Sequence, residues 1–132
     1  MAYRSIETKI WQDSKFKKLD VNCKLVFVYL ITNIHTHYCG LYYIPIQLIG
    51  LELDMPFRDV DAAINNLIST GFIKYDNSNS VVWVINMTKY QCKSSQVKLI
   101  IGIHHYLEGI DSALVNDYFV YYNNILDSVS IR

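Results

Sequence analysis

The sequence predicts an α+β, mainly helical fold, and three observations support this prediction. Residues 56–71 place apolar side chains at helical spacing and end on a glycine. Two short runs rich in β-branched and aromatic residues follow directly, separated by the polar sequence NSNS, which is typical of a hairpin. Further helical patterns lie before this helix and after this hairpin.

The size and composition fit one globular domain. The chain has 132 residues, of which 52% are hydrophobic, and this excludes a largely disordered protein. The formal net charge is zero, so any surface that binds nucleic acid must be a local basic patch. The three cysteines form no Cys-x-x-Cys motif, no secretory signal is visible, and the longest apolar run is only Leu25–Ile31. These features favour a reduced, cytoplasmic protein without a membrane span.

The N-terminal segment predicts an extended arm or an edge strand. Residues 3–16 (YRSIETKIWQDSKF) begin with alternating apolar and polar side chains, the pattern of a half-buried strand. Three apolar residues of this segment are expected to contact the core: Ile6, Ile10 and Trp11.

The first helix is expected over residues 20–33. Asp20 is a candidate N-cap, because an aspartate side chain can accept a hydrogen bond from an unpaired N–H of the first turn. Asn33 is a plausible end of the helix. The expected apolar face consists of Leu25, Val28 or Tyr29, and Ile31 or Thr32.

A short strand and a short helix are expected next. The sequence GLYYIP is aromatic and bounded by Gly40 and Pro45, which fits a strand of about five residues. Pro45 also suits the first turn of a helix, and residues 46–54 (IQLIGLELD) follow with a short helical pattern.

The clearest helix in the sequence precedes Gly71. Asp54 is a candidate cap, and Pro56 lies near the first helical position. The apolar stripe falls at positions i, i+4, i+7 and i+8 and consists of Val60, Ile64, Leu67 and Ile68. Gly71 stands where a left-handed residue commonly ends a helix, so that Phe72 and Ile73 turn back toward the stripe.

The hairpin over residues 72–86 is followed by a basic connector and two amphipathic helices. The connector covers residues 88–96 (TKYQCKSSQ), and the helices are expected at about Gln96–Glu108 and Ser112–Leu126. The inward residues of the first are expected to be Val97, Ile100, Ile101, His104 and Leu107. Those of the second are Leu114, Tyr118, Phe119, Tyr122 and Ile125.

The predicted order is helix, strand, helix, helix, strand, turn, strand, which is the order of a winged helix-turn-helix domain. Two helices joined by the sequence DMP supply the helix-turn-helix, and the hairpin after Gly71 supplies the wing. We therefore predict a winged-helix domain with an N-terminal arm over residues 1–92. Residues 93–132 are expected to form a C-terminal helical extension that serves as an interface or an oligomerisation surface.

A DNA-binding surface is predicted on the second helix of the pair and on the wing. Early exposed residues of a recognition helix meet base edges, and arginine and asparagine can pair with guanine and adenine. Lysines of the wing and its exit can contact phosphates, which position a protein without reading sequence. The predicted DNA-binding residues are Arg58, Asn65, Asn66, Ser69, Lys74, Lys89 and Lys93.

Acidic residues favour an alternative, in which the same helix is a solvated face or contacts another protein. Asp59 and Asp61 repel phosphate, and one arginine against two aspartates gives residues 56–71 a net charge of −1. The apolar sequence VVWVI and the tyrosine-rich last helix also favour protein contacts. The predicted oligomer interface consists of Tyr118, Phe119, Tyr121 and Tyr122.

A metal site is a hypothesis for the stretch NIHTHYCGLYYIP. His35, His37 and Cys39 alternate, and alternate side chains of an extended strand share one face. A zinc site needs four ligands, or three and a water, and no fourth ligand is nearby in the sequence. The more distant choices are Cys23, Cys92, His104 and His105. Gly40 makes the stretch equally suitable as a loop, so we predict no metal and no other cofactor.

No enzymatic activity is expected. The sequence has no glycine-rich phosphate loop and no Gly-x-Ser-x-Gly motif. A cysteine and a histidine could form a dyad in three dimensions, but no local signature indicates one.

Four sequences within residues 3–98 carry a resemblance to a known family: WQDSKF at Trp11–Phe16, LITN at Leu30–Asn33, GFIKYD at Gly71–Asp76 and KYQ at Lys89–Gln91. With them the chain resembles the N-terminal domain of phage replisome-organizer proteins, the prophage relatives of the bacterial primosome protein DnaD. The resemblance implies a winged helix that helps to open or mark a replication origin and to load the replicative helicase, without catalysis. It also implies self-association and a separate C-terminal domain that carries much of the DNA binding, for which 132 residues leave no room.

We therefore expect a non-catalytic, phage-type replication-initiation module that binds DNA. Its expected partners are DNA, further copies of the chain and possible helicase-loading proteins. The alternatives are a protein–protein oligomerisation adaptor and a winged-helix transcriptional regulator.

Overall fold

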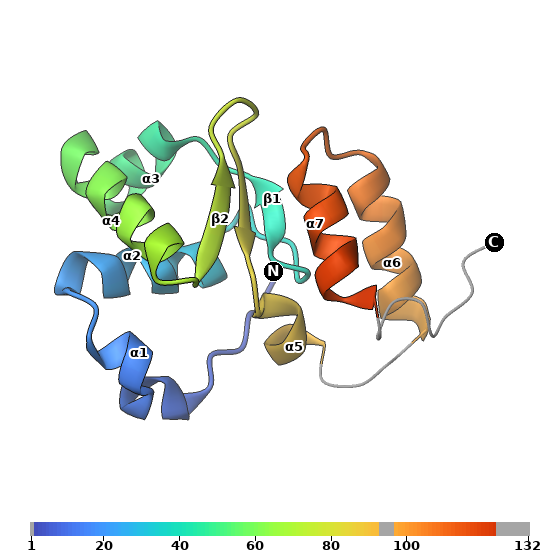
Figure 1. The fold of residues 1–132 in the computed structure, drawn as a ribbon, viewed down its shortest axis with the longest axis horizontal. Helices are drawn as coiled ribbons and strands as arrows, with labels where there is room; N and C mark the ends of the chain where they lie inside the picture. The colour runs from blue at the N-terminus through green and yellow to red at the C-terminus, as the bar shows by residue number, and fades with distance from the viewer. Residues whose placement is uncertain (1, 93–96, 124–132) are drawn as a thin grey trace.

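The protein consists of three layers, with a small sheet between two groups of helices (Figure 1). The structure is a computed structural model and describes residues 2–92 and 97–123. The fold is α+β and mainly helical, with one three-stranded antiparallel sheet in the described part of the chain. The fold class predicted from the sequence is confirmed at this level.

The two helical layers come from different parts of the chain. One contains α2 (Val21–Thr32), α3 (Ile46–Leu53) and α4 (Phe57–Ser69). The other contains α6 (Val97–Glu108) and α7 (Leu114–Tyr121), on the opposite side of the sheet (Figure 1). None of the helices in the described residues is both long enough and apolar enough to cross a bilayer.

The sheet confirms the predicted hairpin and the predicted short strand. It contains β1 (Leu41–Tyr43), β2 (Ile73–Asp76) and β3 (Val81–Val84), in the spatial order β1-β3-β2. Both outer strands pair antiparallel with β3, and Tyr42 lies opposite Val82. The strand nearest the N-terminus therefore joins a hairpin that follows it by about thirty residues in the sequence.

Strand β3 is buried on both faces, and this explains its apolar sequence VVWV. Val82 and Val84 belong to a core shared with α2, α3 and α4. Val81 and Trp83 belong to a second core shared with α6 and α7. Alternate residues of a strand point to opposite faces, so a central strand of a sheet covered on both sides must be apolar throughout. The interpretation of this strand as a binding surface is wrong, because the chain itself covers it.

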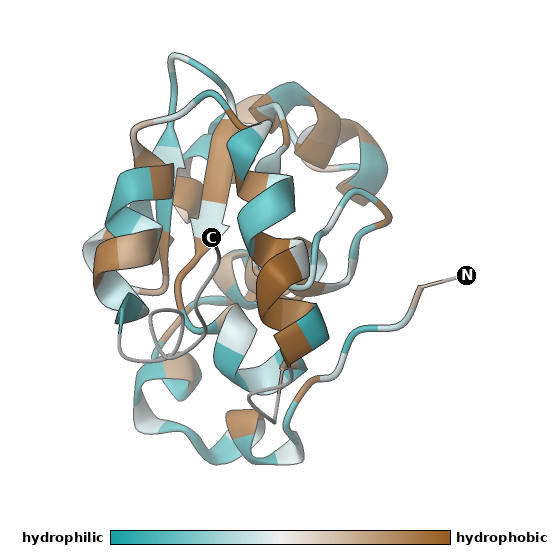
Figure 2. Ribbon diagram, turned by 90° about the vertical axis from the view of Figure 1, so that its right-hand side faces the viewer, coloured by the Kyte–Doolittle hydropathy of each residue, from teal (hydrophilic) through white to brown (hydrophobic). Residues whose placement is uncertain are grey.

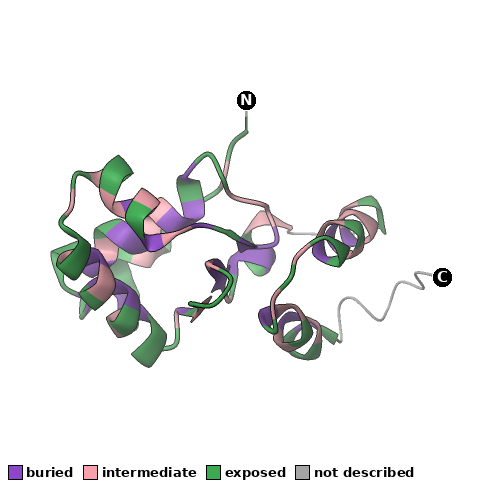
Figure 3. Cartoon of the chain, turned by 90° about the horizontal axis from the view of Figure 1, so that it is seen from above, coloured by how far each residue is buried: buried purple, intermediate pink, exposed green. Residues whose placement is uncertain are grey.

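The C-terminal helices pack on the sheet and share its second core. The buried residues of this core are Cys39, Leu41, Val81, Trp83, Ile100, Ile103, Leu107, Leu114, Tyr118 and Tyr122. Figure 3 shows buried residues on both sides of the sheet. Figure 2 shows that both hydrophilic and hydrophobic residues occur along these two helices. Of the predicted inward residues, Val97 is instead 54% exposed, and Ile125 lies outside the described residues.

The second half of the N-terminal segment is helical and no edge strand forms there, so the edge-strand alternative is wrong, whereas residues 2–7 lie outside any helix or strand, as expected for an arm. A 3-10 helix, η1 (Thr8–Gln12), is followed by α1 (Ser14–Lys17). The carboxylate of Asp13 accepts hydrogen bonds from the N–H groups of Lys15 and Phe16, at 2.8 and 3.3 Å. This cap outweighs the short apolar alternation, since it satisfies two donors of the first turn. The predicted core contacts are half-buried at Ile6 and Ile10, whereas Trp11 is 60% exposed.

The ends of α2 were predicted correctly and its buried face was not. Asp20 caps the helix by accepting the Cys23 N–H at 2.8 Å, and Asn33 is the C-cap. Leu25, however, is 45% exposed. The buried residues are Cys23, Val26, Phe27, Leu30 and Ile31. Almost every residue in the second half of this helix is apolar, so spacing alone could not tell which side faces the core.

Helix α4 has the predicted length but a different start. Asp54 ends α3 in a left-handed conformation with φ 53°, and Pro56 is the N-cap of α4. Gly71 ends the helix with φ +85°, as predicted. Ile68 is 37% exposed and lies at the edge of the buried stripe.

Part of the predicted connector after the hairpin forms a further short helix, α5 (Met87–Gln91).

Candidate nucleic-acid interface

The outward face of α4 is the candidate interface. Its orientation is set by four buried residues: Val60, Ala63, Ile64 and Leu67. The opposite side presents Phe57, Arg58, Ala62, Asn65 and Ser69 to solvent. The Arg58 side chain is 90% exposed, so its guanidinium group is free to approach a large partner.

A tight turn sets α4 against α3. Three residues separate the two helices, and Asp54 supplies the left-handed conformation that reverses the chain. The Met55 N–H donates to the Gly50 carbonyl oxygen at 3.0 Å, which closes the end of α3. The predicted pair of short helices is therefore present, with α4 on the outside of the molecule (Figure 1).

The charge of the α4 face is weakly acidic. Arg58 Nε lies 4.0 Å from Asp59 Oδ1. Asn65 Nδ2 donates to Asp61 Oδ2 at a distance of 3.4 Å. Both contacts are at the surface, where water and salt compete with them, so each can be exchanged for a contact with another molecule at little cost.

Asn66 does not belong to the exposed part of this face. The residue is half-buried, and its Nδ2 donates to Cys23 Sγ at 3.2 Å, which directs the amide toward α2. Of the predicted contacts on α4, the exposed ones are Arg58, Asn65 and Ser69.

The predicted lysines lie next to α7 instead of α4. Lys74 Nζ is 3.7 Å from Asp117 Oδ2, on the sheet face that α7 covers. Lys89 Nζ is 3.4 Å from the hydroxyl oxygen of Tyr121. Lys93 lies outside the described residues. The described members of the predicted DNA-binding set thus separate into one group on α4 and another beside α7.

Most of the predicted oligomer interface is used inside the chain. Tyr118 and Tyr122 are 0% and 2% exposed. The Tyr118 hydroxyl lies 2.7 Å from Thr88 Oγ1, and the Tyr122 hydroxyl donates to the Ile85 carbonyl oxygen at 2.5 Å. In this fold neither tyrosine can contact a partner, and the prediction is wrong for both, because internal partners for the hydroxyl groups allow full burial. The remaining members of the predicted interface are partly exposed: Phe119 and Tyr121.

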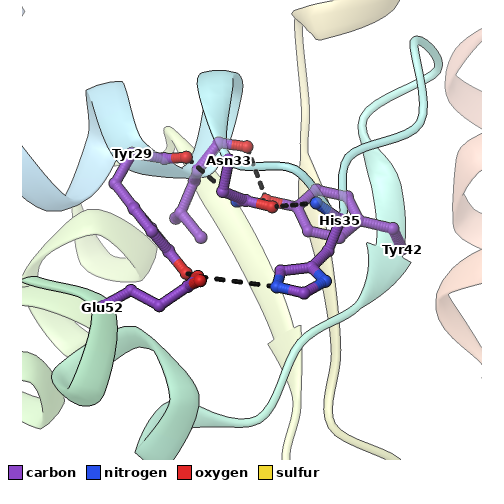
Figure 4. Close-up of polar contacts among 6 residues, drawn as sticks. Tyr29, Asn33, His35, Tyr42 and Glu52 are labelled. Atoms are coloured by element: carbon purple, nitrogen blue, oxygen red, sulfur yellow. Dashed lines mark hydrogen bonds and ion pairs between the residues drawn. The ribbon is translucent and has the colours of Figure 1, made fainter. Parts of the chain in front are cut away.

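The alternating histidines and cysteine point in three directions. His35 Nε2 lies 3.5 Å from Glu52 Oε1 at the surface (Figure 4). The His37 ring stacks on Tyr106, with 3.7 Å between the ring centroids and 5° between the planes. Cys39 is fully buried in the second core. Among the described residues no three potential ligands lie close enough to hold a metal ion.

Burial keeps His37 and Cys39 uncharged. Burial, with a smaller effect of the Arg4 charge, lowers the pKa of His37 to about 4. The neutral ring accepts the Cys39 N–H on Nδ1 at 3.1 Å. Burial raises the pKa of the Cys39 thiol to about 12, so the thiolate that metal binding or nucleophilic attack requires is absent at neutral pH.

A polar cluster at the end of α2 was not predicted from the sequence (Figure 4). Asn33 Nδ2 donates to the Tyr29 carbonyl oxygen at 2.9 Å and to the Tyr42 hydroxyl at 2.8 Å, and its Oδ1 accepts the His35 N–H at 2.8 Å. The Tyr29 hydroxyl donates to Glu52 on α3. The cluster ties α2 to β1 and α3 and so positions the helix pair. The only sequence signal was Asn33 as a helix end.

The chain was compared with known proteins in three ways. No family model matches it, and neither the curated proteins nor the solved structures contain a significant match. These comparisons therefore supply no evidence on the function of the chain.

Proposed function

We propose that this chain is a non-catalytic winged-helix module that binds DNA in phage-type replication initiation. The element order α2, β1, α3, α4, β2, β3 is that of a winged helix-turn-helix, and the sheet order β1-β3-β2 fits the same architecture. The observation that carries the proposal is an uncovered recognition-type helix, α4, packed beside the β2–β3 hairpin. The same features support the assignment of the fold as a winged helix-turn-helix with two additional C-terminal helices.

In the proposed complex, α4 enters the major groove and the hairpin lies along the adjacent backbone. Arg58 contacts phosphate or a guanine edge, and Asn65 and Ser69 follow on the same side of the helix. A single arginine on a face of net charge −1 supplies few phosphate contacts. We therefore expect the isolated chain to bind duplex DNA weakly, with little sequence preference, and to lose affinity as salt rises.

The role in replication follows from the resemblance to phage replisome organizers. It includes a cytoplasmic location, self-association on DNA and contact with helicase-loading proteins. Because Lys74 is paired with Asp117, it contributes little to a DNA-binding surface. Because Tyr118 and Tyr122 are buried inside the chain, they contribute little to an oligomer interface. A second surface, or a second copy on the same duplex, would raise the affinity by increasing the number of phosphate contacts.

The test is a fluorescence-anisotropy titration of a labelled duplex over a series of salt concentrations. We expect the Arg58→Ala variant to bind more weakly and to lower the slope of log K against log salt by about one unit, because one phosphate contact is lost. The matched control is Lys98→Ala, which removes an exposed cation from α6 on the other side of the sheet.

Two results would contradict the proposal. One is the absence of binding at low salt and micromolar protein. The other is an unchanged affinity in Arg58→Ala together with a loss in Lys98→Ala, since DNA would then contact the α6 side. Protection of the promoter of its own gene, instead of an origin, would favour the transcriptional regulator.

A protein–protein adaptor is the second candidate, and exposed apolar residues on the helix pair favour it. Leu51 on α3 is 77% exposed and Phe57 at the start of α4 is 56% exposed. Large exposed apolar side chains beside acidic groups are more typical of a protein interface than of a DNA surface. Light scattering distinguishes the two candidates: a strictly monomeric chain that still binds DNA would exclude a self-associating adaptor.

A further inference from the structure

A cavity of about 470 Å³ lies between the N-terminal segment, α2 and α5. No residue of α4 lines it, so it is separate from the candidate DNA interface. Its volume falls within the range of roughly 300–1,000 Å³ typical of pockets for small molecules.

The floor of the cavity is apolar and belongs to the first core. It is formed by Phe27, Ile31, Phe72, Val84 and Met87. The rings of Phe27 and Phe72 meet edge to face, with 5.0 Å between their centroids. An aromatic floor of this kind favours a flat apolar group, which can stack on one ring and contact the edge of the other.

The N-terminal segment forms one wall and is held at its outer end by a pair of hydrogen bonds. Ile6 and Ile10 contribute apolar side chains to the wall. The Ser5 N–H donates to Gln91 Oε1 at 2.8 Å, and Gln91 Nε2 donates back to the Ser5 carbonyl oxygen at 2.7 Å. Both residues also line the cavity, so this paired contact closes one side of it. A compact molecule fits such a site better than a polypeptide segment that must pass through.

The charged residues at the rim disfavour an anion. Among the described residues that line the cavity, Glu7 and Asp13 supply two carboxylates against the ammonium group of Lys9, a net charge of −1 for this set. Tyr90 and Asn86 add hydroxyl and amide groups that can meet a polar substituent of a neutral ligand.

We propose that this cavity binds an uncharged, mainly apolar aromatic molecule. The proposal does not depend on DNA binding, because the two sites share no residues. Binding would also join the N-terminal segment to α2 and α5, and would stabilise the folded chain.

The test uses two fluorescent probes that differ by one sulfonate group. N-phenyl-1-naphthylamine is neutral, and 8-anilinonaphthalene-1-sulfonate has the same aromatic skeleton with a negative charge. We expect saturable binding of the neutral probe at one site per chain, about tenfold tighter than binding of the sulfonate. Equal affinity for the two probes, or no saturable binding of the neutral one, would overturn the proposal.

Two tryptophan variants of the N-terminal segment locate the binding site. Ile6→Trp enlarges a side chain of the wall, and we expect it to weaken binding of the neutral probe about tenfold, because an overfilled site must be repacked. Tyr3→Trp introduces the same residue at a position that is 83% exposed and does not line the cavity, and we expect no change.

A third variant tests the paired hydrogen bonds and remains informative if Ile6→Trp does not fold. Gln91→Ala removes both contacts to Ser5, and we expect faster release of the neutral probe in stopped-flow measurements. Circular dichroism checks that each variant is folded. If folded Ile6→Trp binds the probe as tightly as Tyr3→Trp, or Gln91→Ala releases it at the rate of the unmodified chain, the probe is bound elsewhere and the proposal is wrong.

Discussion

Replacing Gly71 and Gly40 by alanine is expected to destabilise the protein by different amounts. The two glycines share a backbone conformation that other residues avoid, with φ +85° and +84°. A Cβ atom at Gly71 would have no other atom within 4 Å. At Gly40 it would lie 2.6 Å from Met87 Cβ and 2.8 Å from the Val84 carbonyl oxygen. The pair therefore separates the cost of the backbone conformation from the cost of a steric clash.

The magnitudes follow from these distances. The left-handed conformation costs a residue with a Cβ roughly 1–2 kcal/mol, and this is the whole expected cost of Gly71→Ala. Gly40→Ala carries the same cost and adds an overpacking cost of about 1–3 kcal/mol. The clashing atoms are a backbone oxygen and a Cβ, which cannot move away as the end of a flexible side chain can. We therefore expect Gly40→Ala to be the more destabilising variant by about 1–3 kcal/mol.

Urea denaturation followed by circular dichroism measures both free energies of unfolding. Gly109→Ala is the control, because its Cβ would meet only the Tyr106 carbonyl oxygen at an ordinary 3.6 Å and its φ is not left-handed. If Gly40→Ala is no more destabilising than Gly71→Ala, the close approach of β3 and α5 to Gly40 is refuted. A neutral effect of Gly71→Ala would refute the left-handed end of α4.

Two further predictions concern charged residues. Asp117→Asn frees Lys74, but Lys74 lies on the sheet face beside α7 and away from α4, so we expect DNA affinity in the anisotropy assay to stay within about twofold, since an exposed ion pair is worth at most about 1 kcal/mol. Asp111→Asn removes the same charge from an exposed position as a control, and clearly tighter binding in Asp117→Asn alone would contradict this expectation. Asp20→Ala is expected to cost about 1 kcal/mol at neutral pH, because the N-cap of α2 is lost. The hydrogen bond from the Cys23 N–H lowers the pKa of Asp20 in the folded state, so its stabilisation is present above the unfolded-state pKa and disappears as pH falls through the folded-state pKa. Denaturation at several pH values should therefore show the two proteins converging in acid, and a constant difference would contradict the cap.

The elements that the sequence predicted correctly depend on contacts between near neighbours. The cap of α2 at Asp20, the left-handed end of α4 at Gly71 and the polar turn of the hairpin each involve residues within a few positions of one another. Such contacts form in almost any tertiary context, so residue type and spacing are enough to locate them.

The errors arose where two local interpretations competed. Asp54 is a good cap for α4 by its type, but it also tolerates the left-handed conformation, and in the structure it ends α3. Asp13 was not recognised as a cap, although an aspartate directly before a short helical sequence is the same signal that was used for Asp20.

Which of the predicted residues are open to a partner depends on the packing of distant elements, and local sequence patterns do not contain that information. Arg58 and Lys74 are both exposed basic residues close to the predicted helix-turn-helix. Only the packing of α7 on the sheet shows that Lys74 faces Asp117, whereas Arg58 lies on an uncovered helix. Tyr118 and Tyr122 find their internal partners, Thr88 and the Ile85 carbonyl oxygen, 30 and 37 positions away in the sequence.

The sequence by itself determined the main helices and strands after residue 20 and the order in which they follow, but not the short helices η1, α1 and α5, because the main elements depend on backbone preference and on nearby side chains. The tertiary structure alone decided which faces remain open to a partner. The two sides of β3, the tyrosines of α7 and the cavity beside the N-terminal segment are all defined by elements distant in the chain. Burial is a property of how such elements pack against one another, and a linear pattern of apolar residues does not specify which surfaces meet.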